Sequence, residues 1–127
     1  MEKYLIDTNV VSDYFAASFS VDGLNFMDTV FDSIPTISVI TQIELLCWQT
    51  DPLTELKVKE FIDDSAIIEI SPDVVGRCVN IRRSKKIKTP DAIIAATALA
   101  YNLTLITNNE KDFVHIKGLK ICNPYKI

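Results

Sequence analysis

Near one end the chain reads Tyr4-Leu5-Ile6-Asp7-Thr8-Asn9, three apolar residues followed directly by an acid and two small polar residues. An apolar run that stops at such a group predicts a buried strand that ends where a helix begins. In an open α/β sheet, ligands bind at the carboxyl ends of the strands, so Asp7 is a candidate site residue. Asp is also a favoured residue at a helix N-cap, and that interpretation of Asp7 stays open.

Segments typical of strands alternate with segments typical of helices along the chain. Strands are predicted at residues 4–6, 36–40, 66–70, 103–107 and 120–122, and helices at about 9–17, 24–31, 41–48, 52–62, 72–81 and 92–101. A polar turn is predicted at 108–112. This alternation favours an α/β fold with a mostly parallel sheet and helices on both of its faces.

Local patterns within these segments make finer predictions. Thr41, followed three residues later by Glu44, predicts a capping box at a helix start. The helix at 92–101 is apolar almost all round and is expected to be buried. The residues predicted to face the core are Leu53, Leu56, Phe61 and Ile62 in the helix at 52–62, and Val74, Val75, Cys78, Val79 and Ile81 in the next helix.

Composition limits the classes of protein to consider. The 127 residues suit one domain spanning 1–127, and a net charge of -4 speaks against a passive nucleic-acid binder. It does not exclude an enzyme that reaches phosphates through metal ions held by its own carboxylates. The three cysteines form no CxxC pair, which predicts reduced thiols rather than a zinc site or disulfides. With neither a signal peptide nor a long apolar run, we expect a cytoplasmic protein.

Three further acids join Asp7 as candidates, each with a simpler alternative. Glu44 shares a predicted helix face with apolar residues, where a carboxylate is costly unless paired, although a capping-box acid at the helix edge explains it too. Asp91 lies in the first turn of the buried helix, where an acid also stabilises the helix dipole. Asp112 follows the strand at 103–107 and belongs either to the site or to a solvated turn.

Together, Asp7, Glu44, Asp91 and Asp112 predict a cluster of carboxylates near one edge of the sheet. Such a cluster persists only if cations neutralise it or the pKa values rise. Oxygen ligands without cysteine or histidine favour Mg²⁺ or Mn²⁺ over zinc. His115, the one histidine, is expected to have a surface role rather than a catalytic one. Carboxylate-bound Mg²⁺ can activate water, so the predicted reaction is metal-dependent phosphodiester hydrolysis.

A basic run precedes Asp91. From Arg77 to Lys88 there are six basic residues and no acid. A solvated loop explains the run without any further role, and a contact with substrate phosphates explains it equally well. The residues proposed to hold an RNA backbone are Arg82, Arg83, Lys85, Lys86 and Lys88.

Four stretches in chain order resemble the motifs of PIN domains. They are Leu5-Ile6-Asp7-Thr8-Asn9-Val10, Ser38-Val39-Ile40-Thr41-Gln42-Ile43-Glu44-Leu45, Lys88-Thr89-Pro90-Asp91-Ala92-Ile93-Ile94-Ala95-Ala96-Thr97-Ala98 and Leu105-Ile106-Thr107-Asn108-Asn109-Glu110-Lys111-Asp112-Phe113. Each motif is modest, but all four in this order at this length are specific. Within the family, the chain is most similar to VapC-type ribonuclease toxins of prokaryotic toxin–antitoxin pairs.

The resemblance implies a three-layer α/β/α fold and Mg²⁺- or Mn²⁺-dependent cleavage of RNA. It carries over Asp7, Glu44 and Asp91 as catalytic metal ligands and Asp112 as a fourth acid. It also implies that Thr8 and Asn109 are supporting polar groups, and that the chain forms a homodimer and binds a cognate antitoxin. One departure is Cys47-Trp48, where many relatives have a Tyr-Gly pair, which puts local packing rather than the acids in doubt.

Rival interpretations fit the residues less well. A phosphoacceptor receiver needs an acid pair after the first strand and a lysine after the last core strand, and here Thr8 and Asn108 occupy those places. A phosphatase with Asp7 as nucleophile needs an acid two residues on, where Asn9 stands. A non-catalytic RNA- or protein-binding module of the same fold stays the alternative to an endoribonuclease.

Overall fold

A computed structural model describes residues 2–16 and 18–127, which form five strands and seven α-helices within the described part of the chain. The strands are β1 (Tyr4–Ile6), β2 (Thr36–Ser38), β3 (Ala66–Ile68), β4 (Thr104–Ile106) and β5 (Ile121–Cys122). The helices are α1 (Thr8–Phe15), α2 (Val21–Asp32), α3 (Val39–Cys47), α4 (Pro52–Asp63), α5 (Pro72–Ser84), α6 (Thr89–Ala100) and α7 (Glu110–Phe113), and a 3₁₀ turn, η1, covers Pro124–Lys126. None of the helices described is long and apolar enough to cross a membrane.

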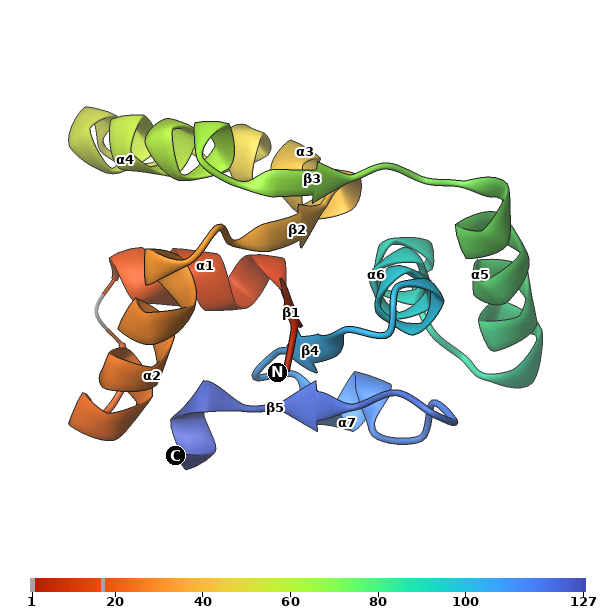
Figure 1. Ribbon diagram of the computed structural model, residues 1–127. Coiled ribbons are helices and arrows are strands. Elements are labelled where there is room, and N and C mark those ends of the chain that lie inside the picture. The colour runs from red at the N-terminus through yellow and green to blue at the C-terminus, as the bar shows by residue number, and fades with distance from the viewer. Residues whose placement is uncertain (1, 17) are drawn as a thin grey trace.

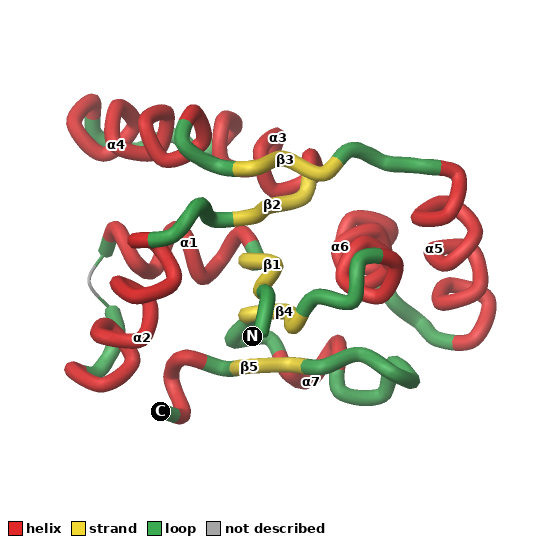
Figure 2. Tube along the Cα trace, viewed as in Figure 1, coloured by secondary structure: helices red, strands yellow, loops and turns green. Residues whose placement is uncertain are grey.

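Every strand pairing in the described residues is parallel. β4 lies between β1 and β5, and β2 pairs with β3. The three-stranded sheet β1–β4–β5 and the two-stranded sheet β2–β3 meet where β2 lies beside β1. Figure 2 shows these short strands in the middle of the molecule, and Figure 1 shows α1 and α2 on one side and α5 and α6 on the other. The predicted α/β fold with a mostly parallel sheet is confirmed.

Alternate side chains of the central strands β1 and β4 pack into two separate hydrophobic cores. Leu5 and Leu105 pack with α5 and α6, whereas Ile6 and Ile106 pack with α1, α2 and α4. Successive side chains of a strand point to opposite faces, so a strand covered on both sides is apolar at every position. This explains why apolar residues stand next to each other in both strands, Leu5-Ile6 in β1 and Leu105-Ile106 in β4, and why each strand ends at a polar residue.

The helix at 92–101 was expected to be buried, and the structure confirms this for α6. Its buried positions include Ala92, Ala95, Ala96 and Ala98, and it packs along α5. Small side chains let two helices approach closely, so α6 can lie between the sheet and α5. Only its first turn carries a charge, at Asp91.

The predicted capping box at Thr41 is wrong. Strand β2 ends at Ser38, whose hydroxyl accepts a hydrogen bond from the backbone N–H of Ile40 at 3.1 Å, and helix α3 begins directly after it. Thr41 is inside this helix and fully buried. The β-branched residues Val39 and Ile40 look like strand, but the cap supplied by Ser38 outweighs that weak preference.

Other boundaries and faces differ from prediction. Leu53 and Leu56 are 61% and 54% exposed, and Val75 and Val79 are 50% and 48% exposed. The positions that do reach the core follow helical spacing, Val58, Phe61 and Ile62 in α4 and Val74, Cys78 and Ile81 in α5. The residues between them fall on other faces of the same helices. The predicted polar turn at 108–112 is partly helical because α7 begins at Glu110.

Two glycines in helices provide a matched test of packing. A Cβ at Gly23 would lie 2.4 Å from the backbone oxygen of Pro124, whereas nothing lies within 4 Å of a Cβ at Gly76. We expect Gly23→Ala to destabilise the fold by about 1–3 kcal/mol because backbone must move. Gly76→Ala should stabilise it by about 0.5–1 kcal/mol through helix propensity. Urea unfolding measures both, and equal effects would contradict the close approach of α2 and η1.

Candidate metal-binding site

Asp7 is held at the end of β1 by three hydrogen bonds. Its backbone N–H donates to the carbonyl of Ile106 at 2.9 Å. Its carboxylate accepts the backbone N–H of Thr8 on Oδ1 and the hydroxyl of Thr107 on Oδ2, both at 2.8 Å. The side chain is only 4% exposed. Asp7 is therefore the N-cap of α1 and also a buried acid at the end of a strand, so the helix-cap and the site interpretations of this residue are compatible.

Burial and neighbouring acids raise the pKa of Asp7 to about 6. Burial is the largest cause because it disfavours the charged form. The hydrogen bonds from Thr107 and Thr8 lower the pKa, and the negative charges of Asp91 and Glu44 raise it. Carboxylates from three separate segments therefore act on one another electrostatically.

Thr8 connects Asp7 to Glu44. Its hydroxyl donates to Glu44 Oε1 at 2.6 Å and lies 3.0 Å from the hydroxyl of Thr41. A hydroxyl carries a single hydrogen, so when Thr8 donates to Glu44 the hydrogen between the two threonines comes from Thr41. The predicted supporting position of Thr8 beside Asp7 agrees with these contacts.

Glu44 is exposed, which differs from the argument made from its helix face. Ile43 on the same stretch is 53% exposed, and Cys47 is also exposed. The apolar stripe of α3 therefore does not force Glu44 into an apolar environment. What ties Glu44 to the site is its contact with Thr8, together with its effect on the pKa of both Asp7 and Asp91.

Asp91 lies half-buried in the first turn of α6. Burial raises the pKa of its carboxyl, and the charges of Asp112 and Glu44 raise it further. Lys88, which directly precedes α6, lowers it. The acid of the third motif thus lies within electrostatic reach of the acids of the second and fourth motifs.

Asp112 reaches the site through Asn109. The Asn109 side-chain amide donates to Asp112 Oδ2 at 2.8 Å, and its backbone N–H donates to the Thr107 hydroxyl at 3.0 Å. Thr107 in turn donates to Asp7, so a chain of hydrogen bonds joins the first and fourth acids. Asn109 therefore lies beside Asp112, where the resemblance implies a supporting polar group.

Thr107 is the site residue that the sequence analysis missed. It is fully buried and links Asp7 to Asn109. Strand β4 pairs with β1 with Ile106 opposite Ile6, so Thr107 follows β4 at the place where Asp7 follows β1. A polar residue directly after the buried apolar pair Leu105-Ile106 was the available signal, because a polar residue after Leu5-Ile6 singled out Asp7.

The donor chemistry of the four acids fits a hard divalent cation. Among the described residues, the ion pairs are Arg77 with Asp73 and Lys126 with Glu110, so no lysine or arginine neutralises the four acids by direct contact. An oxygen that accepts one hydrogen bond keeps a lone pair for a metal. Within 2–16 and 18–127, however, no three acid, cysteine or histidine side chains already converge tightly enough to form a closed metal centre. The set supplies oxygen ligands without a preformed coordination shell.

The basic residues proposed to contact RNA lie between the end of α5 and the start of α6. Arg82 and Arg83 occupy the last turn of α5, and Arg82 Nε donates to the carbonyl of Ile87 at 3.2 Å. Lys85 is half-buried, whereas Lys86 and Lys88 are exposed. Lys88 is the one with an electrostatic effect on a candidate ligand, Asp91.

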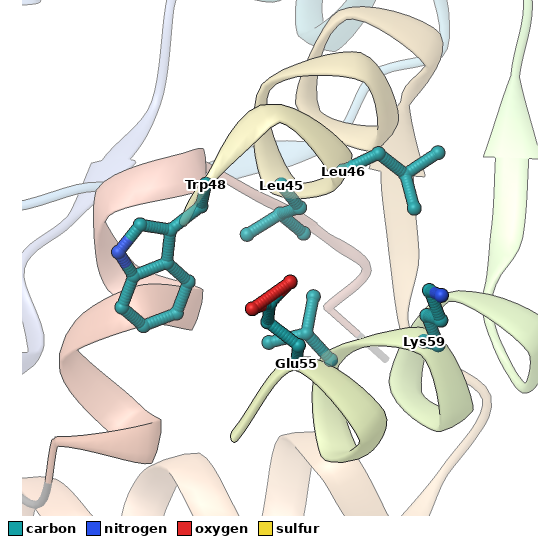
Figure 3. Close-up of a pocket in the computed structure, with 6 residues that line it drawn as sticks. Leu45, Leu46, Trp48, Glu55 and Lys59 are labelled. Atoms are coloured by element: carbon teal, nitrogen blue, oxygen red, sulfur yellow. The ribbon is translucent and has the colours of Figure 1, made fainter. Parts of the chain in front are cut away.

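A separate hollow lies between α3 and α4 (Figure 3). Leu45, Leu46 and Trp48 line one side of it, and Glu55 and Lys59 the other. None of its six lining residues is a candidate metal ligand. Trp48 is half-buried here, while Cys47 is exposed, so the Cys47-Trp48 pair lies at the packing of α3 against α4 and away from the four acids.

Comparison with known proteins identifies relatives across the full length. The sequence pattern of the PIN domain matches residues 4–119. A chain in a toxin–antitoxin complex from Klebsiella pneumoniae is 34% identical, with a TM-score of 0.79 over 98% of this chain and 100% of that one. FitAcB from Neisseria gonorrhoeae shares the fold at 22% identity, with a TM-score of 0.80 over 98% of this chain and 99% of that one. DNA-bound VapBC from Salmonella typhimurium shares it at 21% identity, with a TM-score of 0.79 over 98% of this chain and 99% of that one. Among curated protein sequences, none matches.

The raised pKa of Asp7 makes stability of the metal-free protein depend on pH. Ionisation of Asp7 costs more free energy in the folded state than in the unfolded state. The free energy of unfolding therefore falls as pH rises from 3.8, the ordinary pKa of the group, through about 6, its pKa in the folded protein. Asp7→Asn removes this ionisation. We expect the variant, in chelator at pH 7.5, to be more stable than the parent by up to about 3 kcal/mol.

Urea unfolding from pH 4 to 8 measures the effect. The stability difference between parent and Asp7→Asn should grow through the Asp7 titration and then level off. Asp63→Asn, an exposed acid at the end of α4, is the matched control and should show no such growth. A difference that stays constant with pH would contradict the raised pKa.

Proposed function

The chain belongs to the PIN domain family, and on that premise we propose that it is the toxin of a VapBC-type toxin–antitoxin pair, a metal-dependent endoribonuclease acting in the cytoplasm. The observation that carries the proposal is the set of four acids at one end of the sheet, mutually coupled and without a basic partner in direct contact among the described residues. Such a set is costly in an empty state and is stabilised by cations. The relative from Klebsiella pneumoniae, a toxin–antitoxin complex, supports the biological role.

Asp7, Glu44 and Asp91 would hold a Mg²⁺ or Mn²⁺ ion, with Asp112 as a fourth acid. The bound ion supplies a water molecule of lowered pKa as the nucleophile and neutralises charge on the phosphodiester. This chemistry needs no histidine, which agrees with the exposed position of His115 after α7.

The polar residues around the acids orient them. Thr107 holds Oδ2 of Asp7, and Thr8 holds Oε1 of Glu44 beside it. Asn109 holds Oδ2 of Asp112 and is itself fixed by Thr107. Partners of this kind fix the direction of ligand side chains and are important for metal affinity. Substrate phosphates would approach the same edge from the side of the basic run, with Arg82, Arg83, Lys85, Lys86 and Lys88 holding the RNA backbone.

Cleavage of total cellular RNA by the purified protein tests the activity. With Mg²⁺ we expect discrete fragments, and chelator should abolish them. Asp7→Asn should slow cleavage by about a hundredfold or more because ligand loss removes several kcal/mol of transition-state stabilisation. Since this variant is expected to fold at least as well as the parent, its loss of activity would report chemistry rather than unfolding.

The control for the cleavage assay is Asp63→Asn, which changes an exposed acid outside the site and should cleave at the parent rate. Fragments that persist in Asp7→Asn would indicate a contaminating nuclease. No cleavage by folded protein free of antitoxin would favour the non-catalytic binding module instead.

We also propose a homodimer and a cognate antitoxin as partners. Exposed apolar side chains support association, since Ile43, Leu46, Leu53 and Leu56 are each more than half exposed on α3 and α4. Light scattering should give twice the 14.3 kDa chain mass for the purified protein. A mass of one chain at every concentration would contradict the dimer, and an antitoxin would be identified by copurification from its native host.

A further inference from the structure

Asp13 is an acid outside the set of four, and it joins the first motif to the fourth. It lies half-buried in α1, the helix that Asp7 caps. Its Oδ2 atom accepts the side-chain amide of Asn108 at 2.8 Å and the hydroxyl of Tyr125 at 2.6 Å. Three segments that are separate in the sequence, α1, the segment after β4 and the turn η1, therefore meet at one carboxylate oxygen.

Tyr125 belongs to an anchored turn. Its backbone N–H donates to Oδ1 of Asn123 at 3.0 Å, and its ring lies against Phe19 with the ring centroids 4.7 Å apart. Pro124 is buried, and its backbone oxygen lies so close to Gly23 of α2 that a Cβ there would come within 2.4 Å of it. Figure 1 shows this turn beside α2. The backbone that presents the Tyr125 hydroxyl is therefore fixed by its own cap and by α2.

The hydrogen bonds to Asp13 have a defined direction. An ionised carboxylate accepts and cannot donate, so Tyr125 and Asn108 are the donors. Burial raises the pKa of Tyr125, and its hydrogen bond to Asp13 raises this pKa further, so the phenol keeps its proton. No lysine or arginine among the described residues forms an ion pair with Asp13. The charge of the carboxylate is therefore available to strengthen both hydrogen bonds.

Asn108 connects this contact to the candidate metal site. It directly follows Thr107, whose hydroxyl donates to Asp7. It directly precedes Asn109, whose side-chain amide donates to Asp112. A shift of Asn108 would therefore move both neighbours that orient candidate ligands.

Helix α7, which carries Asp112, depends on contacts from outside. It has only four residues, and a helix this short is not stable on its own. Its N-cap residue, Asn109, makes no side-chain hydrogen bond to the helix backbone. Its first residue, Glu110, forms an ion pair with Lys126 of η1. The turn η1 thus holds this segment twice, once through Asp13 and once through Lys126.

We propose that Asp13 is a positioning residue for the metal site. Through Asn108 it fixes the segment that bears Asn109 and Asp112, and Tyr125 fixes Asp13 in turn. The hydrogen bonds of Asp13 and Tyr125 go to each other and to Asn108 rather than to the four acids, so their effect on a bound cation passes through Asn108. The inference rests on the proposed metal-dependent function, and it makes cation affinity depend on a turn that lies outside the set of ligands.

Mn²⁺ binding to the metal-free, full-length protein tests this role, with free Mn²⁺ measured by electron paramagnetic resonance. Asp13→Ala and Tyr125→Phe should each raise the Kd for Mn²⁺ by about threefold to tenfold, less than the loss expected for a direct partner of a ligand. Tyr125→Phe keeps the ring against Phe19 and removes only the hydroxyl. Tyr101→Phe, at an exposed tyrosine after α6, is the matched control and should leave Kd unchanged. Thermal melts in chelator confirm that each variant is folded.

Two further variants distinguish positioning from a general loss of packing. Asp13→Asn keeps an oxygen that can accept both donors, so its Kd should lie closer to that of the parent than the Kd of Asp13→Ala does. Asn108→Ala added to Asp13→Ala should weaken Mn²⁺ binding no further, because both changes break the same connection. Equal weakening by Asp13→Asn and Asp13→Ala, or additive effects of Asp13→Ala and Asn108→Ala, would overturn the positioning role.

RNA cleavage by the same proteins separates this inference from the proposed function. In Tyr125→Phe, the Mg²⁺ concentration for half-maximal cleavage should rise more than the rate at saturating Mg²⁺ falls. Cleavage by the parent, with the Kd for Mn²⁺ unchanged in Asp13→Ala and Tyr125→Phe, overturns the positioning role and leaves the ribonuclease. Weakened Mn²⁺ binding in these variants, without any cleavage by the parent, supports the positioning role and contradicts the ribonuclease. A parent protein that binds no Mn²⁺ overturns the inference together with the metal-dependent mechanism.

Discussion

The hydrogen bond from Thr107 to Asp7 is the interaction on which the candidate site depends. It joins the ends of two neighbouring strands whose residues are a hundred positions apart in the chain. A buried carboxylate is costly, and this bond together with the N–H of Thr8 offsets part of that cost. The same hydroxyl accepts from Asn109, so the fourth motif is positioned by the first. Loss of Thr107 would therefore disturb Asp7 and Asp112 at once.

The pairing of β1 with β4 is what makes this interaction possible. Both strands are buried on both faces, since alternate residues enter the core beside α5 and α6 or the core beside α1, α2 and α4. A strand fixed on both faces cannot shift its register without moving apolar side chains out of place. The polar residues that end the two strands are therefore held at the same level, which is the constraint a metal site needs.

Charge separation gives the molecule its second organising feature. The acids of the site lie beside a basic segment, yet no lysine or arginine among the described residues binds them directly. Lys88 acts on Asp91 only at a distance. A cation can therefore neutralise the acids without first displacing a basic side chain, and the residues proposed to contact RNA stay free for that role. The family membership and the proposed chemistry are consistent with this division.

The sequence by itself determined the α/β class, the four acids as candidates and the family, because strand ends and helix starts are written in local patterns of apolar and polar residues. The predicted helix starts at 52 and 72 also agree with the structure, where Pro52 and Pro72 begin α4 and α5 directly after the caps Asp51 and Ser71. Prediction from the sequence failed at one local boundary, because Ser38 rather than Thr41 caps α3. It also failed for the faces of helices, which depend on how each helix packs: Glu44 is exposed, and Leu53 and Val75 face outward. Only the tertiary structure decided the partnership of Thr107 with Asp7, because the ends of β1 and β4 meet only when the sheet and its helices have packed.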